Sequence, residues 1–214
     1  MKSAINKIGF WSGLIAFAAT ISFCVVQVMQ LYGLLTYPGD EILIYGTSLC
    51  IVIPFLVEML ALHYTTPENK RFWSHTALTF SIMYAVFVSA NYVVQLATVI
   101  PMTLEGRLDE IRILQQTPHS MFWNFDAMGY VFMGFATLAA VPIFHTKGFE
   151  KWVRRVLLAN ALITPLIGIV YFYPRYSSTL LLIALPWMIT APLSMLLIAI
   201  NFRKNSKMDN SSLD

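Results

Sequence analysis

The chain has 214 residues, of which 57% are hydrophobic and only 12% are charged. Soluble globular domains carry about 25% charged residues, so most of this surface is expected to face lipid. The net charge of +3 falls in short connections, where membrane topology accounts for it. We therefore expect the lipid bilayer, and no nucleic acid, as a partner. At this length a single domain is the simplest organisation.

Six long apolar runs follow one another along the chain. Each is long enough, at ~20 residues, to cross a bilayer as a helix. The runs are continuously apolar and do not alternate, which favours helices over barrel strands. The sequence predicts an all-α integral membrane protein, with a six-helix transmembrane domain over residues 1–204 and a disordered cytoplasmic tail over 205–214. The transmembrane helices are expected at about 9–34, 42–64, 75–100, 120–144, 153–173 and 179–201.

Basic residues are divided unevenly between alternate connections. Eleven of the 14 Lys and Arg residues lie in the N-terminus, the second and fourth loops and the C-terminal tail. The other loops hold only Arg107, Arg112 and Arg175. The positive-inside rule therefore predicts that both termini are cytoplasmic. The six-span pattern is similar in topology alone to many bacterial inner-membrane proteins, and a bacterial inner (plasma) membrane is the expected location.

The connection between the third and fourth spans is amphipathic. Leu104, Leu108, Ile111 and Leu114 recur at helical spacing among charged residues, and the pattern ends at Pro118. This spacing predicts a short extracytoplasmic amphipathic helix on the membrane surface. The helix is either a structural interfacial element or a lid over an outward-facing cavity.

Two carboxylates, Asp126 and Glu58, lie inside apolar runs. An ionised side chain at the membrane centre costs ~2.5–3.5 kcal/mol even on insertion scales, so both are candidate functional residues. No Lys or Arg lies at matching depth inside an apolar run. A carboxylate without a cationic partner can be protonated, accept hydrogen bonds from amides and tyrosines, or bind a cation or an amine ligand.

Polar and aromatic residues are expected at the depth of Asp126, counting ~1.5 Å per helical residue. Asn91 and Gln95 share a face of the third span, and Tyr130 lies one turn from Asp126. Trp187 stands between two prolines of the last span, and broken helices mark binding sites in transporters. The three amides can instead tie helices together. The predicted ligand-binding residues are Asp126, Asn91, Gln95, Tyr130, Trp187 and Gln27.

A second site is expected nearer the cytoplasmic side, with Glu58 as a relay and Asn160 at a similar depth. Pro54 lies four residues before Glu58 and weakens the hydrogen bonding of the same helix. In the alternative interpretation, Arg154 or Arg155 reaches inward and pairs with Glu58.

These patterns predict a polytopic membrane protein whose intramembrane polar cavity, open to the outer side, binds and passes a small molecule or a cation. One alternative is a membrane sensor or partner subunit without transport activity, acting as a homo-oligomer or with a membrane partner. The other is an intramembrane acid/base enzyme acting on a lipid-soluble substrate. The sequence shows no nucleophile–base set, metal-ligand spacing or nucleotide motif, so an enzyme is less favoured, and no cofactor or metal is expected.

Overall fold

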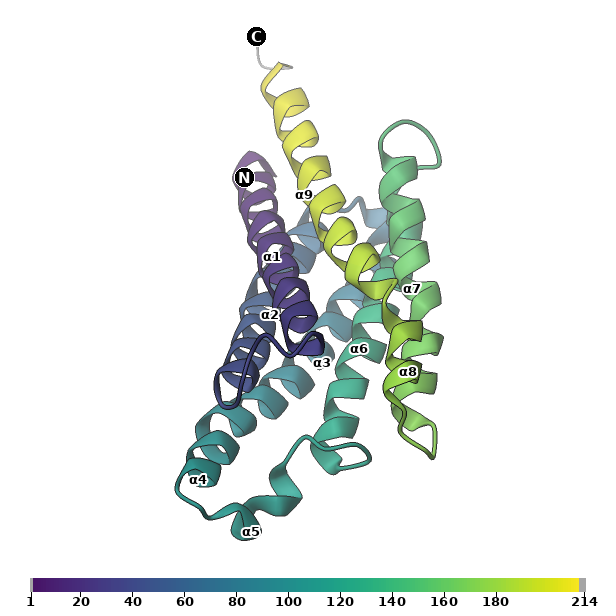
Figure 1. Ribbon diagram of the computed structural model, residues 1–214. Helices are drawn as coiled ribbons and strands as arrows, with labels where there is room; N and C mark the ends of the chain where they lie inside the picture. The colour runs from purple at the N-terminus through teal and green to yellow at the C-terminus, as the bar shows by residue number, and fades with distance from the viewer. Residues whose placement is uncertain (1, 212–214) are drawn as a thin grey trace.

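The computed structural model describes residues 2–211, and within that range it contains helices and connections but no strand (Figure 1). Six of its helical segments are long and apolar enough to cross a membrane, which confirms the predicted all-helical fold and is consistent with a polytopic membrane protein. The first two spans are α1 (Lys2–Leu31) and α2 (Gly39–Thr65). The third runs from α3 (Arg71–Val94) through the π-helical turn η2 (Gln95–Val99) into α4 (Ile100–Leu104). The others are α6 (Met121–Ala140), α7 (Glu150–Phe172), and a broken last span of α8 (Ser178–Leu181), η5 (Leu182–Ala184) and α9 (Trp187–Ser211).

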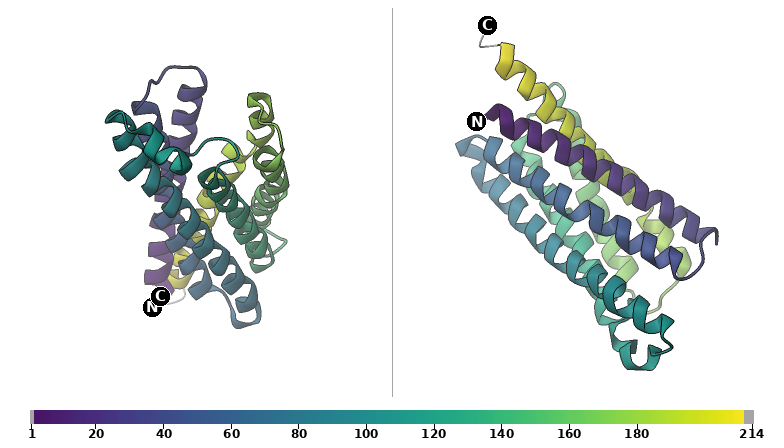
Figure 2. Two further views of the ribbon diagram at one scale, coloured as in Figure 1. Left: turned by 90° about the horizontal axis from the view of Figure 1, so that it is seen from below. Right: turned by 90° about the vertical axis from the view of Figure 1, so that its left-hand side faces the viewer.

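Each span packs against the next one along the chain, and the last span returns to pack against α1. The beginning of α1 and the end of α9 lie at the same end of the bundle (Figures 1 and 2). We call this the proximal end, and the opposite end, which carries α4 and α5, the distal end. Orientation in the membrane stays a prediction, under which the proximal end is cytoplasmic.

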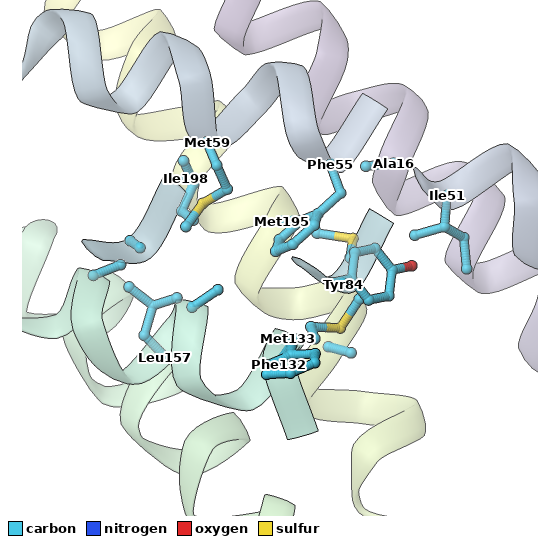
Figure 3. Packing of buried hydrophobic residues seen from close by; sticks show 14 of the residues in the cluster. Ala16, Ile51, Phe55, Met59, Tyr84, Phe132, Met133, Leu157, Met195 and Ile198 are labelled. Atoms are coloured by element: carbon cyan, nitrogen blue, oxygen red, sulfur yellow. The ribbon is translucent and has the colours of Figure 1, made fainter. Parts of the chain in front are cut away.

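The core lies between the spans and is built from Met, aromatic and small residues. Phe55, Met59, Tyr84, Met133 and Met195 meet there (Figure 3). The most enclosed span is α6, where 67% of the residues in its apolar segment are buried, against 33–39% for the others. Large apolar side chains cover the outward faces, which is stable in lipid because lipid tails are as apolar as the side chains.

Close contact between α1 and α9 depends on two glycines. A Cβ added at Gly9 would lie 2.6 Å from the ring of Phe202, and one added at Gly13 would lie 2.8 Å from the Cβ of Ala199. Small residues at four-residue spacing let membrane helices approach closely. A side chain at either glycine would therefore force α1 away from α9.

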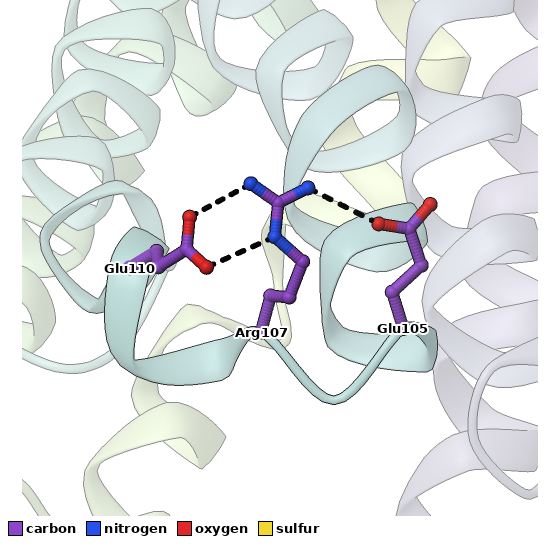
Figure 4. Close-up of polar contacts among 3 residues, drawn as sticks. All are labelled: Glu105, Arg107 and Glu110. Carbon is purple, nitrogen blue, oxygen red and sulfur yellow. Dashed lines mark hydrogen bonds and ion pairs between the residues drawn. The ribbon is translucent and has the colours of Figure 1, made fainter.

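The distal connection between the third and fourth spans contains only short helical turns. They are α5 (Leu108–Ile111) and the 3-10 turn η3 (Arg112–Leu114). Ile111 is buried, whereas Leu104 and Leu108 are exposed. At the surface, Arg107 forms ion pairs with Glu105 and Glu110 (Figure 4). The short amphipathic helix expected on the membrane surface stays a prediction.

Pro186 breaks the last span, while Pro192 is accommodated inside α9. A proline cannot donate to the carbonyl four residues earlier, and the freed carbonyl of Met188 accepts a hydrogen bond from the Cys24 thiol, at 3.7 Å. The helix α9 continues to Ser211. The tail expected to be disordered from residue 205 thus begins as helix, and 212–214 lie outside the described residues.

Candidate functional site

Asp126 joins three spans at the distal side of the bundle. It lies about 8 Å along α6 from the first residue of that helix, at ~1.5 Å per residue. The helix begins at Ser120, whose hydroxyl accepts a hydrogen bond from the backbone N–H of Trp123 at 3.1 Å. The Tyr92 hydroxyl from α3 donates to Oδ1 of Asp126, and the Tyr171 hydroxyl from α7 donates to Oδ2, each at 2.5 Å. Both carboxylate oxygens therefore have a donor.

No cationic side chain pairs with Asp126 in the described part of the chain. Within residues 2–211, the ion pairs involve only Arg71 and Arg107, both at the surface. The tyrosine hydroxyls are neutral donors, and hydrogen bonds to an ionised group are stronger than those between neutral groups. They stabilise a carboxylate at this depth and leave its charge available to a ligand.

Aromatic rings surround Asp126 on the side that faces the bundle interior. A cavity of about 20 Å³ opens against the carboxylate, which is room for about one water molecule. The Tyr130 ring lies edge-on to the Trp187 ring, with centroids 4.9 Å apart. The cavity is lined by Phe23, Ser48, Ile51, Tyr84, Val88, Tyr92, Asp126, Tyr130, Met133 and Trp187.

A second cavity, of about 120 Å³, lies between α1, α7 and the broken last span. It shares Phe23, Tyr130 and Trp187 with the smaller cavity. These three rings form the wall between the two spaces. The lining of the larger space is mostly apolar, and Gln27 of α1 is its one amide side chain. Of the predicted ligand-binding residues, Asp126, Tyr130 and Trp187 thus line one cavity, and Gln27 lines the adjoining one.

Asn91 and Gln95 are both buried but line neither cavity. Gln95 donates to the carbonyl of Leu114 at 2.8 Å and accepts from the backbone N–H of Gln116 at 3.1 Å. Asn91 donates to the Gln116 side chain at 2.8 Å, and Gln116 in turn interacts with Asp126. The two amides therefore hold residues 114–116 over the distal side of the Asp126 site.

A third cavity, of about 400 Å³, lies at the proximal end. Leu62 of α2 and Ile198 and Phe202 of α9 line its deep side. Much of the remaining lining is polar and includes Lys70, whose ammonium group donates to the carbonyl of Ile143 at 2.6 Å. The space is large enough for many water molecules, at about 30 Å³ each.

Glu58 does not line this cavity, whereas Leu62, one turn further along α2, does. Its side chain is 0% exposed, and within residues 2–211 neither carboxylate oxygen has a hydrogen-bond partner. Gly13 makes room for it, because a Cβ there would overlap the carboxylate. The alternative pairing is not seen, since Arg154 donates to the carbonyl of Val141 and Arg155 lies over the Trp152 ring.

Asn160 is a link between α6, α7 and α9. Its amide donates to the Thr137 hydroxyl at 3.3 Å, and its oxygen accepts from the Thr190 hydroxyl at 3.0 Å. Neither bond involves Glu58, so the two residues expected at an inner site are not brought together by hydrogen bonding. In the described part of the chain, no three His, Cys, Asp or Glu side chains gather closely enough to hold a metal ion.

Tyr92 and Tyr171 were missed by the sequence interpretation, although both touch Asp126. A signal for Tyr92 was present, because Tyr84, Val88 and Tyr92 recur every four residues and all three line the small cavity. Trp123 lies three residues before Asp126 on α6. Its indole N–H donates to the carbonyl of Tyr171 at 3.2 Å, which places it beside the site.

Comparisons with known proteins return no relative for this chain. No family model matches it, no curated protein matches it, and no solved structure matches it. The class that the fold defines is a polytopic membrane protein with six apolar helices.

Proposed function

We propose that this membrane protein binds a small organic cation, a molecule carrying an ammonium group, at Asp126. The observation that carries the proposal is a carboxylate with no cationic partner facing a cavity walled by aromatic rings. Aromatic faces attract ammonium groups, by up to about 2 kcal/mol when desolvated. A carboxylate beside such rings favours a cation over a neutral molecule of equal size.

The cavity against Asp126 is too small for an organic cation while Tyr130 and Trp187 keep their present positions. Both rings border the adjoining space between α1 and α7, so a side-chain movement would join the two. Trp187 directly follows the break at Pro186. A broken helix has fewer backbone hydrogen bonds to lose when it moves. Entry through Tyr130 and Trp187 is therefore part of the proposal.

Passage of the bound cation across the membrane is the second part of the proposal. It is supported by the cavity at the opposite, proximal end and by the interrupted last span, a feature of transporter binding sites. The distal cover is held closed by Asn91 and Gln95. A transport cycle requires this cover to open when the proximal side is closed.

Binding is tested with tetramethylammonium and with tert-butanol, a neutral molecule of similar shape. The purified full chain is titrated in detergent, and its tryptophan fluorescence is recorded because Trp123 and Trp187 lie at the site. Saturable binding of tetramethylammonium is expected, with much weaker binding of tert-butanol. Asp126→Asn should weaken the cation's binding at least about tenfold, which corresponds to ~1.4 kcal/mol.

The matched control is Asp109→Asn, the same substitution at an exposed carboxylate, which should leave binding unchanged. Equal affinity for the two probes, or unchanged binding by a folded Asp126→Asn protein, would refute the proposal. Uptake of labelled tetramethylammonium into proteoliposomes then tests passage. Binding without uptake would support the binding site but contradict the proposed transport.

A membrane sensor or partner subunit is the second candidate, and one observation favours it. Both oxygens of Asp126 are already hydrogen-bonded, which is also how a purely structural link between α3, α6 and α7 would look. The same bonds weigh against the acid/base enzyme, because a general base needs a free oxygen within reach of the substrate. Under the structural reading, Asp126→Asn would change stability without any effect on a bound cation.

A further inference from the structure

Glu58 is the most deeply buried ionisable group whose polar atoms have no partner. Its side chain is 0% exposed, and neither carboxylate oxygen accepts a hydrogen bond from any residue between 2 and 211. Gly13 of α1 lies against the carboxyl group, with Ala199 of α9 beside it, and neither residue can titrate or donate from a side chain. An ionised carboxylate in such surroundings is strongly disfavoured. The group is therefore a neutral acid in this conformation.

A route for the proton leads to the proximal cavity. Leu62 follows Glu58 by one helical turn on the same face of α2, and it lines that cavity together with Ile198 of α9. Ile198 and Met59 pack together in the core beside this wall (Figure 3). Leu62 and Ile198 thus form part of the apolar wall of a space of about 400 Å³, one helical turn from Glu58 along α2. The titratable groups around that space are Lys70, His145 and Glu150.

The helix that carries Glu58 can bend one turn away from it. Pro54 lies inside α2, and a proline removes one backbone hydrogen bond and promotes kinking at that point. A change of kink would move Glu58 and Leu62 relative to α1 and α9. Such a movement would admit water to the carboxyl group through the layer formed by Leu62 and Ile198.

We infer that Glu58 is a proton-binding site that exchanges its proton with the proximal cavity. The site stands independently of cation binding at Asp126, since it depends on burial, missing partners and the neighbouring cavity. The proton is held on one carboxyl oxygen and passes to water when the layer opens, leaving a carboxylate that must be reprotonated before the layer closes again. No redox partner or second reactant is needed.

Infrared spectroscopy of the full chain in lipid films tests both parts of this inference. A protonated carboxyl group gives a carbonyl band distinct from that of a carboxylate, and the band shifts when heavy water replaces the proton. The wild type should show this band near neutral pH, and Glu58→Gln should lack it. If Glu58→Gln fails to fold, carbon-isotope labelling of glutamate in the wild type assigns the band instead.

Exchange through the cavity is tested by changing the apolar layer. Leu62→Ala should speed the heavy-water shift severalfold, because it thins the layer between cavity and carboxyl group. Leu60→Ala is the matched control, since Leu60 lies on the same helix with 39% of its surface exposed, and it should leave the rate unchanged. A wild type without the glutamate band, a band that never shifts, or equal rates in both variants would overturn the inference.

Discussion

The two buried carboxylates of this protein are almost equally hidden but differ in what surrounds them. Asp126 is 4% exposed and Glu58 is 0% exposed. Two tyrosine hydroxyls donate to the oxygens of Asp126, whereas those of Glu58 receive no hydrogen bond within the described residues. Burial alone therefore does not distinguish the two acids. They differ in their hydrogen-bond donors, which replace the hydration that burial removes.

The packing around the two acids also differs. Large rings border Asp126 and leave a small cavity against it, so a ligand can reach the acid by moving side chains. Glu58 sits where Gly13 and Ala199 bring α1 and α9 close together, so access to it requires helices to move. The proposed roles follow this difference, with a ligand site at Asp126 and a proton-binding site at Glu58.

The largest expected difference in stability is between two single variants, each of which removes one of the acids. Asp126→Leu strands the hydroxyls of Tyr92 and Tyr171, and each stranded group costs about 1–3 kcal/mol. Glu58→Met keeps a similar volume and removes an acid that has no partner, so it should leave the protein equally or more stable. Thermal unfolding of both variants in detergent measures the difference.

Tyr171→Phe is the control for Asp126→Leu, because it removes one of the two hydrogen bonds and keeps the acid. Its loss of stability should be smaller than that of Asp126→Leu. A Glu58→Met protein that loses as much stability as Asp126→Leu would mean that Glu58 has partners in the membrane that its surroundings here do not provide.

A smaller effect is expected from the amides that cover the Asp126 site. Gln95→Leu removes two hydrogen bonds to residues 114–116, and polar contacts between membrane helices average about 0.6 kcal/mol each. The backbone N–H of Gln116 should exchange with heavy water severalfold faster, because its acceptor is lost. Amide hydrogen exchange read by mass spectrometry measures this change.

Thr79→Val is the control for Gln95→Leu, since Thr79 lies on the exposed face of the same span and bonds only its own helix. It should leave exchange at Gln116 unchanged. Unchanged exchange in Gln95→Leu would show that the cover is held by something other than this amide, and the Asp126 site would then be less dependent on its distal loop.

Most of the fold could be predicted because each membrane span corresponds to one long, continuous apolar run in the sequence. The break in the last span was anticipated from Pro186, since proline acts on its own helix. The sequence did not predict how far the third span extends, since Pro101 follows directly after its expected end at residue 100. The structure continues there as a helix through the π-helical turn at Gln95–Val99, an arrangement that depends on tertiary contacts.

The site was predictable only in part. Asp126, Tyr130 and Trp187 share a cavity because depth and helical spacing place residues along a span. The partners of Asp126 depend on how α3 and α7 are rotated toward α6, which one sequence does not reveal. Asn91 and Gln95 were expected beside Asp126, but their hydrogen bonds go to a loop whose path the periodicity of the spans cannot predict.

An exposed carboxylate, Glu110, completes the comparison, and its substitution should change stability least. Glu110 lies in the distal connection and accepts two hydrogen bonds from Arg107 (Figure 4), and these bonds hold the pKa of Glu110 below its ordinary value of 4.5. A carboxyl group with a lowered pKa in the folded state stabilises the protein above that ordinary value. The contribution is lost as the pH falls through the lowered pKa.

The contribution should nevertheless be close to undetectable, because both side chains of the pair are about half exposed and water and salt screen exposed ion pairs. Glu110→Gln is therefore expected to leave the unfolding temperature unchanged at neutral pH and to remove only a slight dependence on pH below 4.5. Unfolding temperatures of wild type and variant, measured across that range at low and high salt, test this. A loss as large as that of Asp126→Leu would contradict the comparison, because burial and hydrogen-bond donors would then not be what separates the acids of this protein.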